Sequence, residues 1–214
     1  LNKNFNRFLT HLDLSKNLIT EIKSSYFAKN SELTQLILDR NKILSIEINS
    51  FQNLNMLNLL NLSFNQIEHF GQDLFGYEID YLDLRELDLR NNLIKKIQIF
   101  DILIELLKID LSFNLINDLS CMKFDTLINN LNLKNNQLSE ITSFIFQDFF
   151  RYIYLIDLSY NRINRIESYS FYSTTQVLLL DLSHNFLKKF ENNSFVGLYH
   201  LKELILNSNL IEFI

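Results

Sequence analysis

The sequence lacks proline and tryptophan altogether and has only three glycines in 214 residues. Because proline and glycine mark turns and linkers, their scarcity argues against separate domains joined by flexible segments. Long apolar runs are also missing. No run approaches the roughly 18 residues that a transmembrane helix needs, and the richest stretch, residues 97–107, is interrupted by Asp101 and Glu105. We therefore expect one uninterrupted structure without a membrane-spanning helix.

Cysteine is nearly absent as well, since Cys121 is the only one. A single cysteine excludes an internal disulfide and leaves two interpretations. The thiol pairs with another chain in an extracellular setting, or it is a small, partly buried filler, which is how free cysteine usually behaves. We favour the second interpretation.

Basic residues are fewer than acidic ones. The chain has 20 lysines and arginines and 25 aspartates and glutamates, which gives a net charge of −5 and an isoelectric point of about 5.4. Nucleic-acid-binding surfaces are usually basic, so we expect no nucleic-acid partner. The chain also shows no phosphate-binding loop, zinc-ligand spacing or nucleophile motif. No cofactor or metal is therefore expected.

One group of residues is compatible with catalysis: His11, Asp13 and Ser15 alternate along a short stretch and so share one face of a strand. Successive members would lie about 6.5–7 Å apart, whereas a nucleophile and its base must approach about 3 Å. Asp-Leu-Ser also recurs at 110–112, 157–159 and 181–183 without the histidine. We expect no enzyme.

The sequence does contain a repeat. Residues 177–198 follow the order L-x-x-L-x-L-x-x-N-x-L, a pattern of stacked solenoids. The asparagine recurs at intervals of 22 to 27 residues. An apolar residue stands five positions after each one, and in seven units a phenylalanine stands ten positions after it. The asparagines are Asn17, Asn41, Asn65, Asn92, Asn114, Asn136, Asn161, Asn185 and Asn209.

The repeat has a physical explanation. A short strand in each unit points two apolar residues inward, such as Leu180 and Leu182, and Asp181 outward, because side chains alternate across a strand. The chain then turns at the asparagine, whose amide both donates and accepts hydrogen bonds. Stacked asparagines are predicted to form a structural ladder that bridges successive turns. No unit buries its apolar residues alone, so stacking creates one continuous core.

We expect a single domain, 1–214, of about nine repeats that start near residues 9, 33, 57, 84, 106, 128, 153, 177 and 201. The segment Leu1–Phe8 resembles the tail of an earlier repeat, and Ile214 falls inside a repeat. Solenoids need polar caps, and this sequence supplies none. The expectation is a slice, truncated at both ends, of a longer array.

These residues resemble the leucine-rich repeat family, in particular its 24-residue "typical" subtype, which carries the phenylalanine. The repeats are similar to those of Toll-like receptor ectodomains and chaoptin-like adhesion proteins. Two departures are the missing cysteine-rich caps and the missing proline late in the repeat. The resemblance implies an α/β solenoid: a right-handed horseshoe with a parallel concave β-sheet and a convex side of loops and short helices.

The resemblance also implies a function. Family members generally bind proteins on the concave sheet or its edges, which favours a non-catalytic recognition array in an extracellular receptor or adhesion protein. Any membrane attachment would require a segment outside this sequence. The alternative is an intracellular scaffold or regulator that uses the same face. The ligand and the oligomeric state are open.

The outward positions at the strand centres are often acidic. Neighbouring strands lie about 4.8 Å apart, so Asp157 and Asp181 should repel each other. One interpretation is that a cation or a basic partner relieves the repulsion. The other, which we favour, is that Asp-Leu-Ser is the usual strand of this repeat, solvated and neutralised by the serine hydroxyls.

An apolar patch with a polar rim, the usual mark of a partner site, is predicted near the C-terminal end. Leu155 and Leu179 should share one outward row, and Ile205 should lie on the next row of the neighbouring strand. The alternative is that these leucines are partly covered and reflect composition alone. The full candidate set is Tyr154, Leu155, Asp157, Tyr160, Leu179, Asp181 and Ile205.

Two triplets match the N-glycosylation acceptor pattern, at Asn61 and Asn192. A glycan on Asn192 would sit on a turn, whereas one on Asn61 would obstruct the concave face. Such triplets arise by chance in an asparagine-rich chain, so they are weak indicators of secretion.

Overall fold

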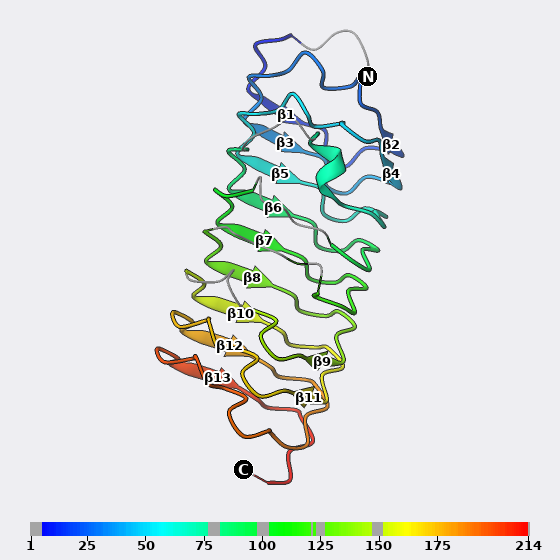
Figure 1. Cartoon of the computed structure of the whole chain (residues 1–214). Coiled ribbons are helices and arrows are strands. Elements are labelled where there is room, and N and C mark those ends of the chain that lie inside the picture. Colours follow the sequence, from blue (N-terminus) through cyan, green and yellow to red (C-terminus); the bar gives the residue numbers. More distant parts are fainter. Residues whose placement is uncertain are drawn as a thin grey trace.

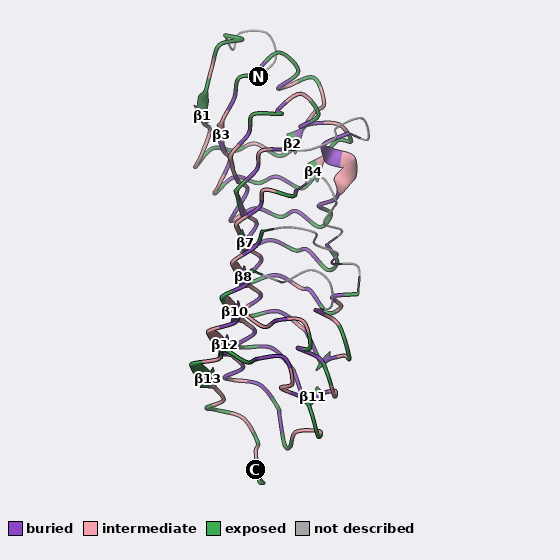
Figure 2. Cartoon of the chain, turned by 60° about the vertical axis from the view of Figure 1, so that its left-hand side comes forward, coloured by how far each residue is buried: buried purple, intermediate pink, exposed green. Residues whose placement is uncertain are grey.

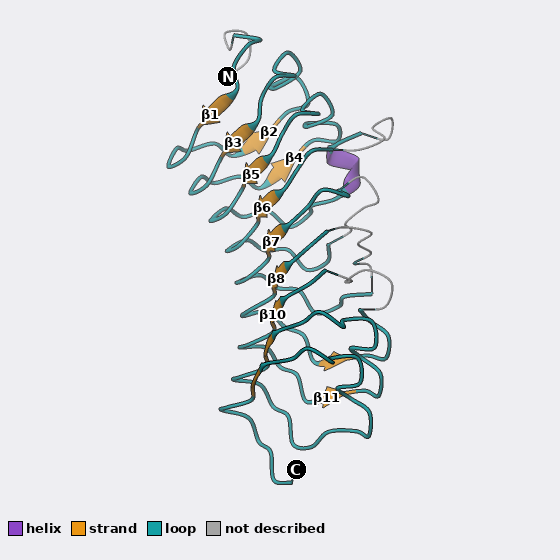
Figure 3. Ribbon diagram, turned by 90° about the vertical axis from the view of Figure 1, so that its left-hand side faces the viewer, coloured by secondary structure: helices purple, strands orange, loops and turns teal. Residues whose placement is uncertain are grey.

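The computed structural model describes residues 6–76, 82–97, 103–120, 122, 127–146 and 152–213. Within these residues one unit is repeated along a gently curved axis, with the N-terminus at one end and the C-terminus at the other (Figure 1). Strands stack on one side, and loops form most of the rest of each turn (Figure 3). The predicted horseshoe solenoid is confirmed.

A parallel sheet lines the concave side, with nine strands in the described part of the chain. Each strand begins two residues after a predicted repeat start and pairs with the strand of the next repeat. The strands are β1 (His11–Asp13), β3 (Gln35–Ile37), β5 (Leu59–Asn61), β6 (Glu86–Asp88), β7 (Lys108–Asp110), β8 (Asn130–Asn132), β10 (Leu155–Asp157), β12 (Leu179–Asp181) and β13 (Glu203–Ile205).

The convex side carries little regular structure. Two short parallel pairs lie there, β2 (Glu21–Ile22) with β4 (Ser45–Ile46), and β9 (Glu140–Ile141) with β11 (Arg165–Ile166). A single 3-10 turn, η1 (Gln72–Leu74), is the one helical segment among the described residues. In the described ranges the convex side is thus almost entirely loop, with less helix there than the resemblance implies. No described helix has the length and apolar character needed to cross a bilayer.

The core includes the convex phenylalanines and the middle residue of each concave strand except the last, where Leu204 of β13 is 37% exposed. Leu36, Leu60 and Leu180 are completely buried, while the residues on either side of each face outward. Phe146 and Phe171 stack with ring centres 5.4 Å apart, so the convex rings continue the core between repeats. Buried residues recur in successive turns along the described part of the stack (Figure 2).

The asparagines close the turns through the backbone. Asn65 Nδ2 donates to the carbonyls of Leu62, in its own turn, and Leu38, in the preceding turn, each at 3.0 Å. Its Oδ1 accepts the amide of Ile43 at 3.0 Å. Asparagines 41, 92, 114, 136, 161, 185 and 209 repeat these contacts. Each amide therefore joins two consecutive turns.

Candidate functional site: the concave sheet

The register of the sheet aligns its outward side chains into two rows. The first row is His11, Gln35, Leu59, Glu86, Lys108, Asn130, Leu155, Leu179 and Glu203. The second row, called the aspartate row below, is Asp13, Ile37, Asn61, Asp88, Asp110, Asn132, Asp157, Asp181 and Ile205. These 18 positions hold seven acids and one lysine, a net charge of −6 against −5 for the whole chain. The strand positions are thus acidic, whereas the residues just outside the strands include the cations Lys16, Arg40, Arg85, Arg90, Lys134 and Lys202.

The carboxylates of the aspartate row are held mainly by backbone amides. Asp157 Oδ1 accepts the amide two residues later, that of Ser159, at 2.9 Å, and Asp13, Asp88, Asp110 and Asp181 make the same turn. The predicted serine hydroxyl contact occurs at Asp110, which accepts Ser112 Oγ at 2.6 Å, and the backbone and side-chain hydrogen bonds from Ser15 both lower the pKa of Asp13. The buried Ser159 hydroxyl has no hydrogen-bond partner among the described residues. Neutralisation by serine hydroxyls is therefore not general.

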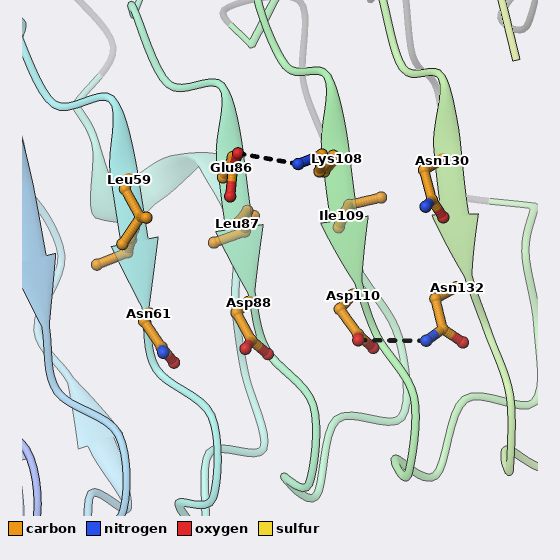
Figure 4. A pocket seen from close by; sticks show the side chains of 11 residues that line it. Leu59, Asn61, Glu86, Leu87, Asp88, Lys108, Ile109, Asp110, Asn130 and Asn132 are labelled. Atoms are coloured by element: carbon orange, nitrogen blue, oxygen red, sulfur yellow. Dashed lines mark hydrogen bonds and ion pairs between the residues drawn. The ribbon is translucent and has the colours of Figure 1, made fainter.

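A hollow of about 280 Å³ opens on this face across β5 to β8. It is bordered by Leu59 and the Glu86–Lys108 ion pair (3.1 Å) on the first row, and by the aspartate row on the other side (Figure 4). Leu87 and Ile109, both 2% exposed, lie between the two rows. The sequence reasoning missed this hollow, although four consecutive short polar residues in the aspartate row indicate it: Asn61, Asp88, Asp110 and Asn132.

Asp88, one of the acids that line the hollow, has a raised pKa. Burial raises its pKa from 3.8 to about 6, against the lowering effects of the Arg90 amide and guanidinium, and the negative charges of Asp110 and Asp39 add to the rise. Arg90 Nε lies 3.3 Å from Asp88 Oδ2. Asp110 Oδ2 instead accepts from Asn132 Nδ2 at 3.2 Å. Ionised Asp88 is therefore short of favourable interactions.

The residues of the predicted apolar patch lie together. Leu155 pairs with Leu179, and Asp157 pairs with Asp181, which pairs in turn with Ile205. The three apolar side chains are partly exposed. Whether they bind a ligand remains a prediction.

Two tyrosines flank the patch. Tyr154 precedes β10 and is 46% exposed, and Tyr160 is 45% exposed. Tyr160 stacks on His184 with ring centres 4.0 Å apart, and Lys134 Nζ lies 5.0 Å from the Tyr160 ring centre. The sequence reasoning did not include His184, although it occupies the same repeat position as Tyr160.

His11, Asp13 and Ser15 do not form a relay. His11 Nδ1 lies 2.9 Å from Thr10 Oγ1, and Asp13 accepts the backbone amide of Ser15 at 2.8 Å. No contact joins His11 to the Ser15 hydroxyl in the described structure. Clusters of three or more histidine, cysteine or acidic side chains able to hold a metal are also absent from the described residues.

The glycosylation candidates differ in their surroundings. Asn61 is partly buried, and its Oδ1 accepts both the amide (3.0 Å) and the hydroxyl (2.7 Å) of Ser63. Asn192 is exposed on a loop. Cys121 lies outside the described residues, so both interpretations of it stay open.

A family model described as leucine rich repeat matches residues 7–75 and 151–211, more than half of the chain. No curated protein matches the sequence. The predicted family, and its likeness to Toll-like receptor ectodomains, are confirmed.

Solved structures share the fold at low sequence identity. A chain of the TLR13–ssRNA13 complex is 24% identical with a TM-score of 0.79, and the match covers 95% of this chain and 33% of that one. A chain of the octameric complex of latrophilin 3, Unc5D and FLRT2 is 25% identical with a TM-score of 0.79, at 95% and 62% coverage. A chain of the Drosophila Toll–Spätzle complex is 20% identical with a TM-score of 0.74, at 95% and 30% coverage. This chain thus spans less than two thirds of each of them.

Proposed function

Because this chain belongs to the leucine-rich repeat family, we propose that it is a non-catalytic protein-recognition array whose concave sheet binds a protein ligand. We assign it to an extracellular receptor or adhesion protein. Toll is solved with Spätzle, and FLRT2 with latrophilin 3 and Unc5D, which supports a protein ligand here. TLR13 is solved with single-stranded RNA. The acidic strand face of this chain argues against that ligand, because phosphate repels carboxylate.

One observation carries the proposal: the sheet face offers apolar side chains to solvent beside polar ones. Leu155, Leu179 and Ile205 are partly exposed on adjacent strands, with Tyr154 and Tyr160 at the rim. Contiguous apolar exposure with a polar rim marks interaction sites, and tyrosine is enriched among residues that dominate binding energy. The patch is therefore the proposed centre of the interface.

The test is a screen of the chain against a library of extracellular proteins, followed by affinity measurements on Leu179→Glu and Tyr160→Ala. We expect each variant to weaken binding at least about tenfold, the loss typical of an interface hot spot. Ile48→Glu is the matched control, since Ile48 is 63% exposed beyond the convex strand β4. If both variants fold and bind as tightly as the parent, the binding site lies elsewhere. A parallel screen with cytosolic proteins tests the intracellular scaffold alternative, and ligands found only there would contradict the extracellular assignment.

A further inference from the structure

The hollow across β5 to β8 has a size and a lining that define what it accepts. At about 280 Å³ it is smaller than most pockets for drug-sized ligands, which measure about 300–1,000 Å³. It is open along the sheet, so a side chain that projects from a docked protein can enter it. The lining combines apolar surface from Leu59, Leu87 and Ile109 with carboxylates and amides on the aspartate row. A long side chain with an apolar stem and a polar head matches this arrangement.

The polar side of the hollow is rich in acceptors. Asp88 and Asp110 are register partners on adjacent strands, and each ionised carboxylate has about four lone-pair sites. Asp110 Oδ1 accepts from the amide and hydroxyl of Ser112, and Oδ2 accepts from Asn132. One lone pair on Oδ2 therefore remains for a further donor.

The existing cations of the hollow leave the carboxylates incompletely neutralised. Lys108 pairs with Glu86, on the first row. Arg90 Nε lies 3.3 Å from Asp88 Oδ2, but the Arg90 side chain is 45% exposed, so solvent screens its charge. The pKa of Asp88 stays raised despite this contact. Asp110 has no cation within ion-pair distance among the described residues. Positive charge to pair with the carboxylates is therefore lacking locally, between β6 and β7.

We propose that the partner inserts an arginine side chain into this hollow, with its guanidinium against Asp88 and Asp110 and its stem on Leu59. This inference rests on the proposed function and specifies the chemistry of the partner. Arginine is favoured over lysine because its planar fork of five donors suits side-by-side carboxylates, and because it is more weakly hydrated. Its methylene stem packs readily on apolar surface.

The charge of the two outward rows supports the same occupant. These 18 strand positions carry the net charge of −6 described above, while cations such as Arg85, Arg90 and Lys134 lie beside them. The attraction for a basic side chain is therefore local to the strand centres, where the hollow lies. The position of the hollow then fixes where the basic side chain docks. The raised pKa of Asp88 provides a direct readout, since a bound guanidinium would lower it.

The probe is a capped pentapeptide with one central arginine between glycines. Its control replaces arginine by citrulline, which has the same shape without the charge. Binding is measured by NMR titration of the parent, of Asp88→Asn with Asp110→Asn, and of Asp13→Asn with Glu203→Gln. The last pair removes the same charge from the two outward rows, outside both the hollow and the apolar patch. We expect citrulline and the first pair to weaken binding about tenfold or more, since one hydrogen bond to a charged group contributes about 1.5–3 kcal/mol. The second pair should change affinity less than about twofold, as screened surface charges do.

Three results overturn the inference: equal losses from the two double variants, equal binding of the citrulline peptide, and tighter binding of a lysine peptide or of Ca²⁺ at Asp88 and Asp110. A protein ligand that depends on Leu179 but not on Asp88 and Asp110 also overturns it, and leaves the proposed function intact. The absence of any protein ligand in the screen contradicts the proposed function instead.

Discussion

The asparagines at the turns, called the asparagine row below, and the aspartate row recur at the same interval along the chain. Only the asparagine row has the same residue type in every repeat. Each asparagine from Asn41 to Asn209 bonds to backbone groups of two turns, and another residue type would leave those groups unpaired. The aspartate row faces solvent and contains aspartate, asparagine and isoleucine in no regular order. The comparison teaches where the repeat is constrained. The corners must satisfy the backbone, and the strand face is free to vary and so to carry specificity.

The largest expected effect tests the asparagine row at its centre. Asn114 bonds to the Leu89 and Leu111 carbonyls and to the Ile94 amide at 3.0–3.1 Å, and it is 5% exposed. Asn114→Ala should destabilise the fold by about 3 kcal/mol, because each unpaired buried group costs about 1–3 kcal/mol. The urea unfolding midpoint measures the change. A loss of no more than 0.5 kcal/mol, about what an ordinary surface substitution gives, would contradict the conclusion that the turns depend on the asparagine hydrogen bonds.

A smaller effect, a gain in stability instead of a loss, is expected for a substitution in the aspartate row. Burial raises the pKa of Asp88 from 3.8 to about 6, with Arg90 opposing and Asp110 and Asp39 reinforcing the rise. The folded state thus holds the proton more tightly than the unfolded state, so stability should fall as pH rises from about 4 to about 6. Asp88→Asn mimics the protonated acid and should stabilise the protein by about 1–2 kcal/mol at pH 7, with no gain at pH 4.

The control for that prediction is Asp13, whose pKa is lowered by the backbone and side-chain hydrogen bonds from Ser15. Its stabilising contribution is present above pH 3.8 and lost at lower pH, so Asp13→Asn should not stabilise at pH 7. Urea unfolding of both variants from pH 4 to 7 gives the two slopes. Parallel slopes would show that burial of Asp88 has no energetic consequence.

The smallest expected loss of stability comes from comparing alanine substitutions at different positions of the asparagine row. The side chain of Asn17 is exposed and bonds to the Leu14 and Ser15 carbonyls of its own turn, each at 3.0 Å. Asn17→Ala should cost about 0.5 kcal/mol or less, as surface substitutions usually do. Asn209→Ala should fall between Asn17→Ala and Asn114→Ala, because Asn209 joins two turns but is only partly buried. Equal costs at all three positions would show that bonding between turns does not set the stability.

The sequence predicts most of the architecture because each turn uses the same few residue types. The spacing of the asparagines places the strands, and alternation around Leu180 separates inward from outward side chains. Register follows as well: Leu155 and Leu179 stand at the same repeat position and pair in the sheet. Serine neutralisation of the aspartates was predicted less well, because a hydroxyl rotamer depends on local packing that the repeat pattern does not specify.

The sequence by itself determined the stacked repeats, the ladder of asparagines and the two outward rows, since these depend on spacing along the chain. Only the tertiary structure decided where the strand face is hollow and which aspartate is hard to ionise. Asn61, Asp88, Asp110 and Asn132 lie 22 to 27 residues apart in sequence and become neighbours only when strands stack about 4.8 Å apart. The hollow and the acidity of Asp88 depend on the volume and charge of those neighbours together, which no single repeat contains.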